Sequence, residues 1–394
     1  MGSSNKNAKA GVRNVLSLGF VSMLNDASSE MIFPLLPLFL VQILGASGFI
    51  VGVVEGIAES TSSLLRTPAG YLSDKIKRRK PFLTIGYGSS AVSKTLLGFS
   101  TIWQHVLALQ FFNRVGKGVR TSPRDALISE SIPSEVRGRY FGLHRAMDTL
   151  GAILGPLIAF ILLPRLANSY TSLFVVAGIL SLFTLVLIQV LIRESATRQS
   201  SERRGVRFTL RPFSQRFKLF LLISGTFTLG NFSYAFLILR AQEVGIATGL
   251  IILLYLAYTI TYALGAYPAG ALSDKIGKVF VIAAGYLAFG LMCVGFALVR
   301  TDILWIMGLF ILYGTFYALA DGTQRALVAD FSPSELRATG LGFFHTTVGF
   351  TALASNFIAG ALWTYLGPIT TFYFGAVLSF ISASLLLIGF PMDK

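Results

Sequence analysis

Twelve long apolar stretches, separated by short polar breaks, constrain this chain more than any other feature. Each can cross a hydrocarbon core about 30 Å thick at about 1.5 Å per helical residue. A spanning segment that does not close a barrel must be helical to satisfy its backbone polar groups. The sequence therefore predicts an all-α membrane protein. The predicted spans are residues 13–43, 49–72, 82–100, 104–129, 138–164, 170–192, 217–240, 248–272, 279–299, 303–329, 338–365 and 369–390.

Composition agrees with a lipid environment. Of 394 residues, 54% are hydrophobic and only 13% are charged, about half the charged share of a soluble domain, which argues against a cytosolic enzyme. The net charge of +15 would suggest a nucleic-acid partner in a soluble protein, but the placement of the cations argues against one. With one cysteine and three histidines, we expect no disulfide framework, no metal site and no other cofactor.

The loops between spans differ in charge. Four of the breaks after odd-numbered spans carry Arg165 as their only cation, whereas the breaks after even-numbered spans are basic. Basic loops stay on the cytoplasmic side, so both termini are expected in the cytoplasm. The basic residues of these breaks are Lys75, Lys77, Arg78, Arg79, Lys80, Arg137, Arg139, Lys275, Lys278 and Arg337.

The two halves of the chain repeat each other at an offset of 200 residues. Residues 68–76 read PAGYLSDKI and residues 268–276 read PAGALSDKI, and a second window, 133–142 against 333–342, matches at the same offset. Each copy holds six spans, an even number, so both copies enter the membrane in the same orientation. The predicted domains are two six-helix bundles, 1–192 and 217–394, joined by a basic cytoplasmic linker at 193–216.

The loop after the second span resembles a signature of the major facilitator superfamily, a glycine followed by an acid and then by basic residues. Its residues are Gly70, Asp74, Lys75, Arg78 and Arg79, echoed in the second half by Gly270, Asp274, Lys275 and Lys278. Lys77 stands where a glycine is common, which the second copy keeps as Gly277. A small residue lets helices approach, and an acid at a helix end can pair with a cation in one conformation, so these residues are latch candidates.

This resemblance covers nearly the whole chain and implies a secondary transporter. Two pseudo-symmetric six-helix bundles would alternate access to a midplane site lined by the first, fourth, seventh and tenth spans. The resemblance also implies a cavity arginine in the fourth span, for which Arg114 is the candidate. Segments 25–37, 55–60 and 114–127 are similar to a bacterial subgroup with some members linked to metal or drug resistance. A monomer in the bacterial inner (cytoplasmic) membrane is therefore expected.

Acidic residues inside the first two spans are candidates for proton coupling. A charge at mid-bilayer costs about 3 kcal/mol on insertion scales, so each needs a partner or an aqueous cavity. Asp26 and Glu30 lie four residues apart on one helical face, as do Glu55 and the deeper Glu59, and such repulsion favours proton uptake. Permanent ion pairing with arginines of the fourth span is the alternative.

The fourth span carries a cationic stripe whose spacings of three, three and four residues place its members on one face. They are Arg114, Lys117, Arg120 and Arg124. Such a stripe should look into a cavity, towards the acids of the first two spans or towards Asp125 and Asp148. In the fifth span, His144, Arg145 and Asp148 are candidates for a gate against the fourth span, where Arg124 is the gate candidate, with an interfacial cluster as the alternative.

The second half offers aromatic and amide groups in place of charge. Asp321 and Arg325, four residues apart in the tenth span, should pair with each other and are further gate candidates. Tyr255 and Tyr258 have helical spacing, which is usual for core packing but would also suit one wall of a substrate cavity. The cavity candidates together are Asn25, Arg114, Lys117, Arg120, Asn231, Tyr234, Tyr255, Tyr258 and Tyr317.

The leading function is therefore a proton-coupled secondary transporter of a small organic solute, with export preferred. Its expected partners are that solute, protons and the lipid bilayer. Uptake or exchange of an anionic metabolite or metal chelate is the alternative, because of the cationic stripe. A membrane-embedded enzyme is a remote alternative, since only His144 with Asp148 resembles a base and its orienting acid. No phosphate-cradling loop is present, so no nucleotide site is expected.

Overall fold

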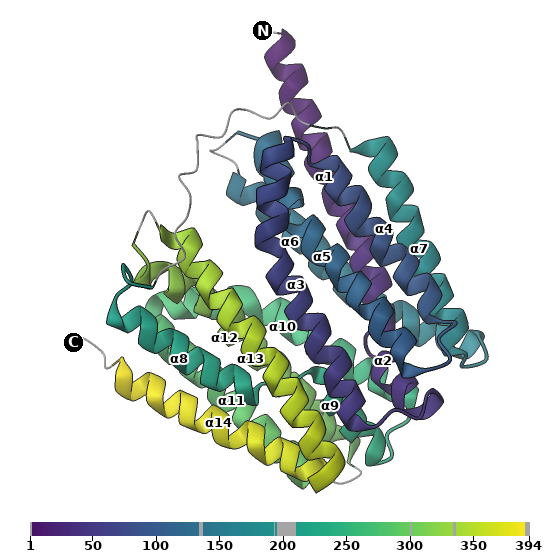
Figure 1. Ribbon diagram of the computed structural model, residues 1–394, viewed down its shortest axis with the longest axis vertical. Coiled ribbons are helices and arrows are strands. Elements are labelled where there is room, and N and C mark those ends of the chain that lie inside the picture. The colour runs from purple at the N-terminus through teal and green to yellow at the C-terminus, as the bar shows by residue number, and fades with distance from the viewer. Residues whose placement is uncertain are drawn as a thin grey trace. The chain divides into compact units, whose positions relative to one another are not determined.

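The computed structural model is all-helical over the residues it describes, 2–133, 137–192, 194, 210–299, 302–333 and 336–390 (Figure 1). Its elements are α1 (Gly2–Ile32), α2 (Leu36–Leu38), the π-helical turn η1 (Phe39–Ile43), α3 (Gly48–Ile76), α4 (Lys80–Leu97), α5 (Trp103–Ser131), α6 (Arg137–Arg165), α7 (Tyr170–Leu191), α8 (Gln215–Gly230), α9 (Tyr234–Glu243), α10 (Thr248–Ile276), α11 (Lys278–Leu298), α12 (Ile303–Phe331), α13 (Arg337–Leu366) and α14 (Pro368–Gly389). This confirms the predicted all-α class.

The helices follow the predicted spans. Because α1, α2 and η1 form one broken segment and α8 with α9 another, the elements make up the twelve expected segments. Nine segments of the described chain are long and apolar enough to cross a membrane, and α4, α5 and α13 are the remaining three. Helix α4 contains Lys94, and α5 contains the four residues of the cationic stripe, so polar side chains lower the mean hydropathy of both helices.

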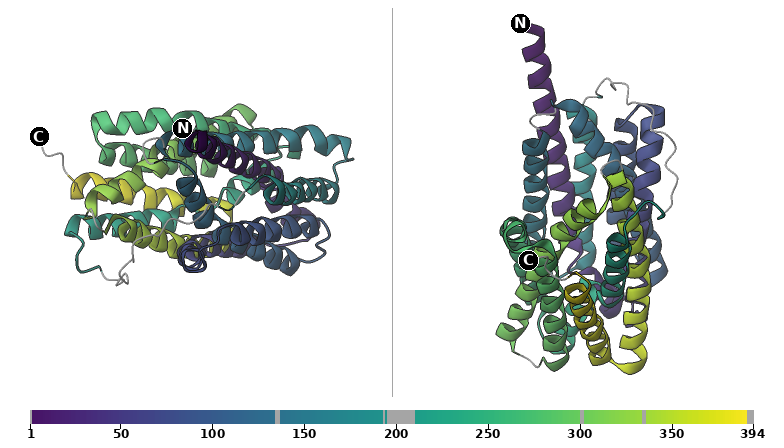
Figure 2. Two further views of the ribbon diagram at one scale, coloured as in Figure 1. Left: turned by 90° about the horizontal axis from the view of Figure 1, so that it is seen from above. Right: turned by 90° about the vertical axis from the view of Figure 1, so that its left-hand side faces the viewer.

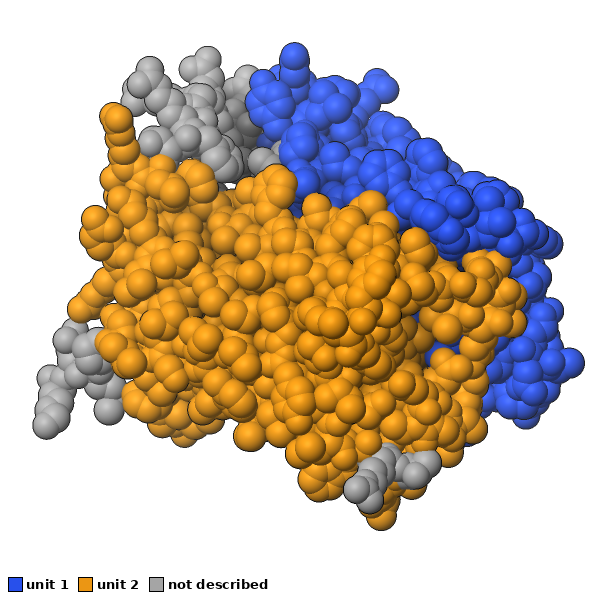
Figure 3. All heavy atoms as spheres, turned by 60° about the horizontal axis from the view of Figure 1, so that its bottom comes forward, with its two compact units in different colours: residues 1–39, 61–204 blue, residues 40–60, 205–394 orange. Residues whose placement is uncertain are grey.

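Contacts divide the chain into two units, coloured separately in Figure 3. Unit 1 comprises residues 1–39 and 61–204, and unit 2 comprises residues 40–60 and 205–394. The first part of α3 thus groups with the second half of the chain. The domain boundaries at 192 and 217 stay a prediction, and most of the basic linker lies outside the described residues.

Within unit 1, α1 packs against α6 and α7, while α4 packs against α5 and α7 (Figures 1 and 2). The buried side chains come from α1, α4, α5 and α7, where apolar residues recur on one face of each helix. They include Val15, Leu18, Val21, Leu83, Tyr87, Leu127, Ile128 and Ile188. Unit 1 therefore has its own hydrophobic core.

Unit 2 repeats this arrangement. Its α11 packs against α12 and α14, as α4 packs against α5 and α7 in unit 1, and its α8 packs against α13 and α14. Helix bounds repeat at the offset of 200 residues: α3 spans 48–76 and α10 spans 248–276, while α5 spans 103–131 and α12 spans 303–331. The duplication inferred from short motifs therefore extends to the helix ends.

The first span of each repeat is interrupted at a corresponding place along its sequence. In the first copy, α1 ends at Ile32 before Pro34, as expected of a residue that cannot donate a backbone hydrogen bond. In the second copy the break lies between Gly230 and Tyr234 without a proline. There the Oγ of Ser233 accepts a hydrogen bond from the backbone N–H of Ala235 at 3.2 Å and caps α9.

The loop after α3 contains a strained residue. Lys77 has a φ of +56°, and its counterpart after α10, Gly277, has a φ of +95°. A left-handed backbone costs a residue with a side chain about 1 kcal/mol, and glycine avoids that cost. This explains why glycine is common at the position.

Replacing Lys77 by glycine is therefore expected to raise the free energy of unfolding by about 0.5–1 kcal/mol. The measurement is the thermal unfolding midpoint of the purified protein in detergent. Gly277→Ala is the reciprocal variant and should lower the midpoint. A lower midpoint for Lys77→Gly would show that contacts of the lysine side chain outweigh the backbone strain.

Candidate functional site

Among the charged residues that the structure describes, Lys94 of α4 is the most buried, with 2% of its surface exposed. Its Nζ donates to the backbone oxygen of Asn25 at 3.1 Å, to Asn25 Oδ1 at 3.2 Å and to Ser28 Oγ at 3.2 Å, and it lies 3.5 Å from Ser181 Oγ. The Ser28 hydroxyl donates to Ala177 O and the Ser181 hydroxyl to Asn25 Oδ1, so both can only accept from Lys94. A shell of acceptors matches the ammonium form, which has three donors and no acceptor.

The predicted proton-coupling residues of α1 lie beside this lysine. Asn25 Nδ2 donates to Asp26 Oδ1 at 3.4 Å, which links Asp26 to Lys94 through one side chain. Asp26 and Glu30, both half-buried, interact electrostatically with the Lys94 ammonium. The two acids and Asn25 are candidates from the sequence, whereas Lys94 was missed there. Lys94 lies within the predicted span 82–100, where a charge is costly. The same reasoning that selected the acids would therefore have selected this lysine.

The members of the cationic stripe of α5 have different surroundings. Arg114 is buried, and its guanidinium carbon lies 5.2 Å from the centre of the Phe33 ring, while Lys117 is half-buried. Arg120 packs on α4, where its Nη1 donates to the backbone oxygen of Gly86 at 3.1 Å and its guanidinium lies 4.3 Å from the centre of the Tyr87 ring. Arg120 thus contacts α4 directly and interacts with Asp26 and Asp148 electrostatically at longer range.

Close packing of α4 on α5 explains this orientation. A Cβ atom at Gly86 would lie 2.5 Å from Arg120 Cβ and 2.6 Å from Gly116 O. The two glycines therefore allow a helix approach that no larger residue permits, and the Arg120 side chain must run along α4. Sequence spacing alone defines a helical face but not the helix that covers it.

Arg124 joins three helices, as the predicted gate would require. Its Nη1 lies 3.7 Å from Asp148 Oδ2 on α6 and donates to Ser22 Oγ on α1 at 2.9 Å, and its Nε lies 3.1 Å from Asp125 Oδ1. His144 Nδ1 is 3.5 Å from Asp148 Oδ2. The third predicted gate residue, Arg145, is exposed. The fifth and fourth spans are thus linked by charge, and a gating role stays a proposal.

The predicted latch motif forms a buried ion-pair group around Arg79. We call Ser73, Asp74, Arg79 and Glu130 the latch cluster. Arg79 Nη2 lies 2.6 Å from Asp74 Oδ1 and 2.8 Å from Glu130 Oε1, and Nη1 donates to Ser73 Oγ at 2.7 Å. Burial disfavours the charged form of Arg79, but the hydrogen bonds to Glu130 and Asp74 outweigh it and raise the pKa of the guanidinium.

The other residues of the motif have different surroundings. Lys75 and Arg78 are exposed, so Arg79 is the motif cation that is buried. At Gly70 a Cβ atom would lie 3.1 Å from Ser122 Cβ on α5, which agrees with the close approach expected of a small residue.

The second copy of the motif is more open. Lys278 Nζ lies 2.8 Å from Asp330 Oδ2, and Asp330 is the counterpart of Glu130 at the offset of 200. Asp274 and Lys275 are exposed, and a Cβ at Gly270 would meet nothing within 4 Å. The two copies thus differ in burial: the acid of the first is paired with Arg79, and that of the second is exposed.

Asp321 and Arg325 of α12 form the ion pair expected from their spacing. Asp321 Oδ2 also accepts a hydrogen bond from the Tyr262 hydroxyl at 2.8 Å. The acid is therefore held by α12 and α10 together.

In unit 2, Glu55 rather than Glu59 is the buried acid of the second span. Glu55 is 7% exposed, and its Oε2 accepts a hydrogen bond from Ser233 Oγ at 2.9 Å, at the interruption between α8 and α9. Ser233 N donates to Asn356 Oδ1 of α13 at 2.9 Å. Glu59 is exposed and interacts electrostatically with the Tyr317 hydroxyl.

The predicted tyrosines gather into one aromatic group across α9, α10 and α12. Ring centres of Tyr234 and Tyr255 are 5.3 Å apart, those of Tyr255 and Tyr258 are 5.4 Å apart, and those of Tyr258 and Tyr317 are 5.8 Å apart. Tyr255 is buried, while Tyr234, Tyr258 and Tyr317 keep part of their surface exposed. Asn231, at the C-terminal cap of α8, is half-buried. The group both packs and presents an accessible aromatic face.

Comparison with known proteins identifies the family. Residues 18–240 and 219–394 match the model of the Major Facilitator Superfamily. The chain belongs to this superfamily. It is 42% identical over 390 residues to an uncharacterized MFS-type transporter of Methanocaldococcus jannaschii, covering 98% of this chain and 96% of that one. It is 27% identical over 188 residues to the multidrug resistance protein MdtH of Salmonella arizonae, covering 45% and 46% of the two chains.

The fold agrees with solved structures of the superfamily. The crystal structure of the nucleoside transporter NupG superposes with a TM-score of 0.80 at 15% identity, covering 96% of this chain and 99% of that one. The major facilitator fold predicted from sequence is therefore confirmed. This chain is a multi-pass membrane protein and a secondary transporter. The alternative of a membrane-embedded enzyme is wrong, because the superfamily is not enzymatic.

Proposed function

We propose that this major facilitator transporter exports a small organic solute across the cytoplasmic membrane and couples that movement to protons through Asp26. The surroundings of Asp26 carry the proposal. Its half-buried carboxylate is linked through Asn25 to Lys94 and interacts electrostatically with Lys117, Arg120, Arg124 and Asp148. Proton uptake by Asp26 removes one negative charge from this set, so it changes the electrostatic energy of helices α1, α4, α5 and α6 together.

The remaining site candidates fit a carrier in which the ionisable residues of unit 1 take part in proton coupling and unit 2 binds the organic solute. Unit 2 supplies the tyrosine face together with Glu59 and Asp321, a combination that suits an aromatic or cationic solute. The resemblance to a multidrug resistance protein supports export. Glu30, Glu55 and Glu59 are the further proton-coupling candidates.

Uptake or exchange of an anionic metabolite or metal chelate is the second candidate function. It is favoured by the cations of unit 1, because Lys94, Arg114 and Arg120 are all buried there. Buried cations attract an anionic cargo when their own acids do not neutralise them.

Proteoliposomes with an imposed pH gradient test the proposal. The probes are ethidium as an organic cation and citrate as an anion. With one proton exchanged per solute, a gradient of one pH unit should concentrate the transported probe about tenfold. Asp26→Asn is expected to abolish this accumulation but to keep counterflow between equal concentrations, because counterflow needs no net proton movement. Glu30→Gln tests the neighbouring acid in the same way.

The control variant is Asp302→Asn, which removes an exposed carboxylate at the start of α12 and keeps the side-chain oxygen that caps this helix. It should concentrate the probe as the unmodified protein does. If the Asp26→Asn protein still concentrates its probe, proton coupling through Asp26 is wrong. Accumulation of citrate without ethidium would favour the second candidate function.

A further inference from the structure

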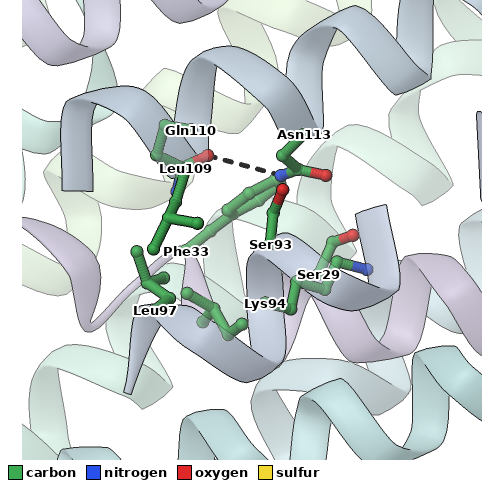
Figure 4. Close-up of a pocket in the computed structure, with 9 residues that line it drawn as sticks. Ser29, Phe33, Ser93, Lys94, Leu97, Leu109, Gln110 and Asn113 are labelled. Atoms are coloured by element: carbon green, nitrogen blue, oxygen red, sulfur yellow. Dashed lines mark hydrogen bonds between the residues drawn. The ribbon is translucent and has the colours of Figure 1, made fainter. Parts of the chain in front are cut away.

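A small pocket lies inside unit 1 between α1, α4 and α5 (Figure 4). The space that its lining leaves free is little more than that of a water-sized group. Nine residues line it, and Lys94 is the charged residue among them. Any occupant must therefore be small.

Two donors that line this pocket have no acceptor among the described residues. Ser90 Oγ donates to Asn113 Oδ1 at 2.7 Å, and Asn113 Nδ2 donates to Gln110 Oε1 at 3.3 Å, the dashed line in Figure 4. This orients the Gln110 amide so that its Nε2 finds no acceptor among the described residues, although Gln110 is only 4% exposed. The Ser93 hydroxyl, also 4% exposed, finds none in the same part of the chain. An occupant of the pocket with an acceptor atom would satisfy both donors.

The direct contacts of Lys94, the charged residue of the pocket, are neutral. The four oxygens around the Lys94 ammonium come from amide, hydroxyl and backbone groups, and none is a carboxylate. Two acids, Asp26 and Glu30, and two cations, Lys117 and Arg120, interact with it electrostatically at longer range. The Lys94 ammonium is therefore held by neutral groups, and no carboxylate neutralises its charge in direct contact.

We propose that the pocket binds a small anion the size of chloride or a single carboxylate group. Gln110 Nε2 and the Ser93 hydroxyl donate hydrogen bonds to it, and Lys94 supplies the positive field. The same chemistry would recognise a free inorganic anion or the carboxylate of a transported solute. This inference deepens the proposed transport function, but binding by the purified protein tests it separately from proton coupling.

The experiment measures the thermal unfolding midpoint of the full-length protein in an uncharged detergent. Sodium gluconate, whose anion is too bulky for the pocket, is replaced by sodium chloride or sodium acetate at constant pH and ionic strength. A bound anion should raise the midpoint by about 2–4 °C. A response to chloride supports a free anion, and a response to acetate alone supports the carboxylate of a solute. No response to either salt overturns the proposal.

A second test does not depend on the choice of salt. Gln110→Glu places a fixed carboxylate in the pocket, so it should raise the midpoint in gluconate and remove the response to chloride or acetate. A pocket that holds only water would instead be destabilised by a buried carboxylate, and a lower midpoint overturns the proposal. Gln110→Leu should abolish the response, whereas the control Gln215→Leu, at an exposed residue of α8, should keep it.

Discussion

Replacing Arg79 by alanine is expected to lower the free energy of unfolding by about 3 kcal/mol. The substitution removes the cation of the latch cluster and leaves the carboxylates of Asp74 and Glu130 close together without a counter-charge. It also removes the donor that reaches Ser73 Oγ. Because its guanidinium pKa is raised by these partners, Arg79 stays charged at any working pH, so the loss should not depend on pH between 6 and about 9. Thermal unfolding of the purified protein is the measurement.

The matched control is the neighbouring residue. Arg78 has the same side chain but is exposed, so Arg78→Ala should change the free energy of unfolding by no more than about 0.5 kcal/mol. Equal losses for the two variants would mean that the loop's positive charge, rather than the latch cluster, stabilises this end of the molecule.

Replacing Gly52 by alanine is expected to lower the free energy of unfolding by about 3 kcal/mol and to reduce transport at least tenfold. A Cβ atom at Gly52 would lie 2.2 Å from the backbone oxygen of Asn356, and a backbone atom cannot move aside as a side chain can. The residue that would be displaced, Asn356, also accepts the hydrogen bond from Ser233 at the interruption of the seventh span.

Gly308→Ala is the control for this variant. Gly308 is also helical, in α12, and its added Cβ would meet nothing within 4 Å. Alanine favours a helix over glycine by about 1 kcal/mol, so this variant should be slightly more stable than the unmodified protein. The two variants should therefore shift the unfolding midpoint in opposite directions, and shifts of the same sign and size would contradict the close approach at Gly52.

Local chemistry made some site residues predictable. Asp321 and Arg325 pair because they are four apart on one helix, a spacing that is the same in every helix. Pro34 interrupts the first span because a proline cannot donate to the helix ladder. Lys77 carries the left-handed backbone that its glycine counterpart adopts without cost.

Contacts between distant segments could not be predicted in this way. Lys94 lies in a polar shell supplied by α1 and α7, and Arg120 packs on α4 because Gly86 and Gly116 meet there. The sequence shows the charges and the glycines but not which helix faces which. Similarly, Arg78 and Arg79 are equivalent in sequence, and only the position of Glu130 on α5 makes the second one the buried cation.

By itself, the sequence determined that the chain lies in a lipid bilayer, how many spans it has, that its halves are duplicated and which superfamily it belongs to. These properties depend on the length of apolar stretches, on loop charge and on short motifs, all of which are local features of the sequence. Only the tertiary structure decided which buried charges meet. The partner of a side chain depends on how its helix is rotated and on where small residues let two helices pack closely, and these helices are far apart in sequence. The contacts of Lys94 with neutral oxygens, beside the donors of Gln110 and Ser93, result from that packing. No residue spacing in the sequence predicts them.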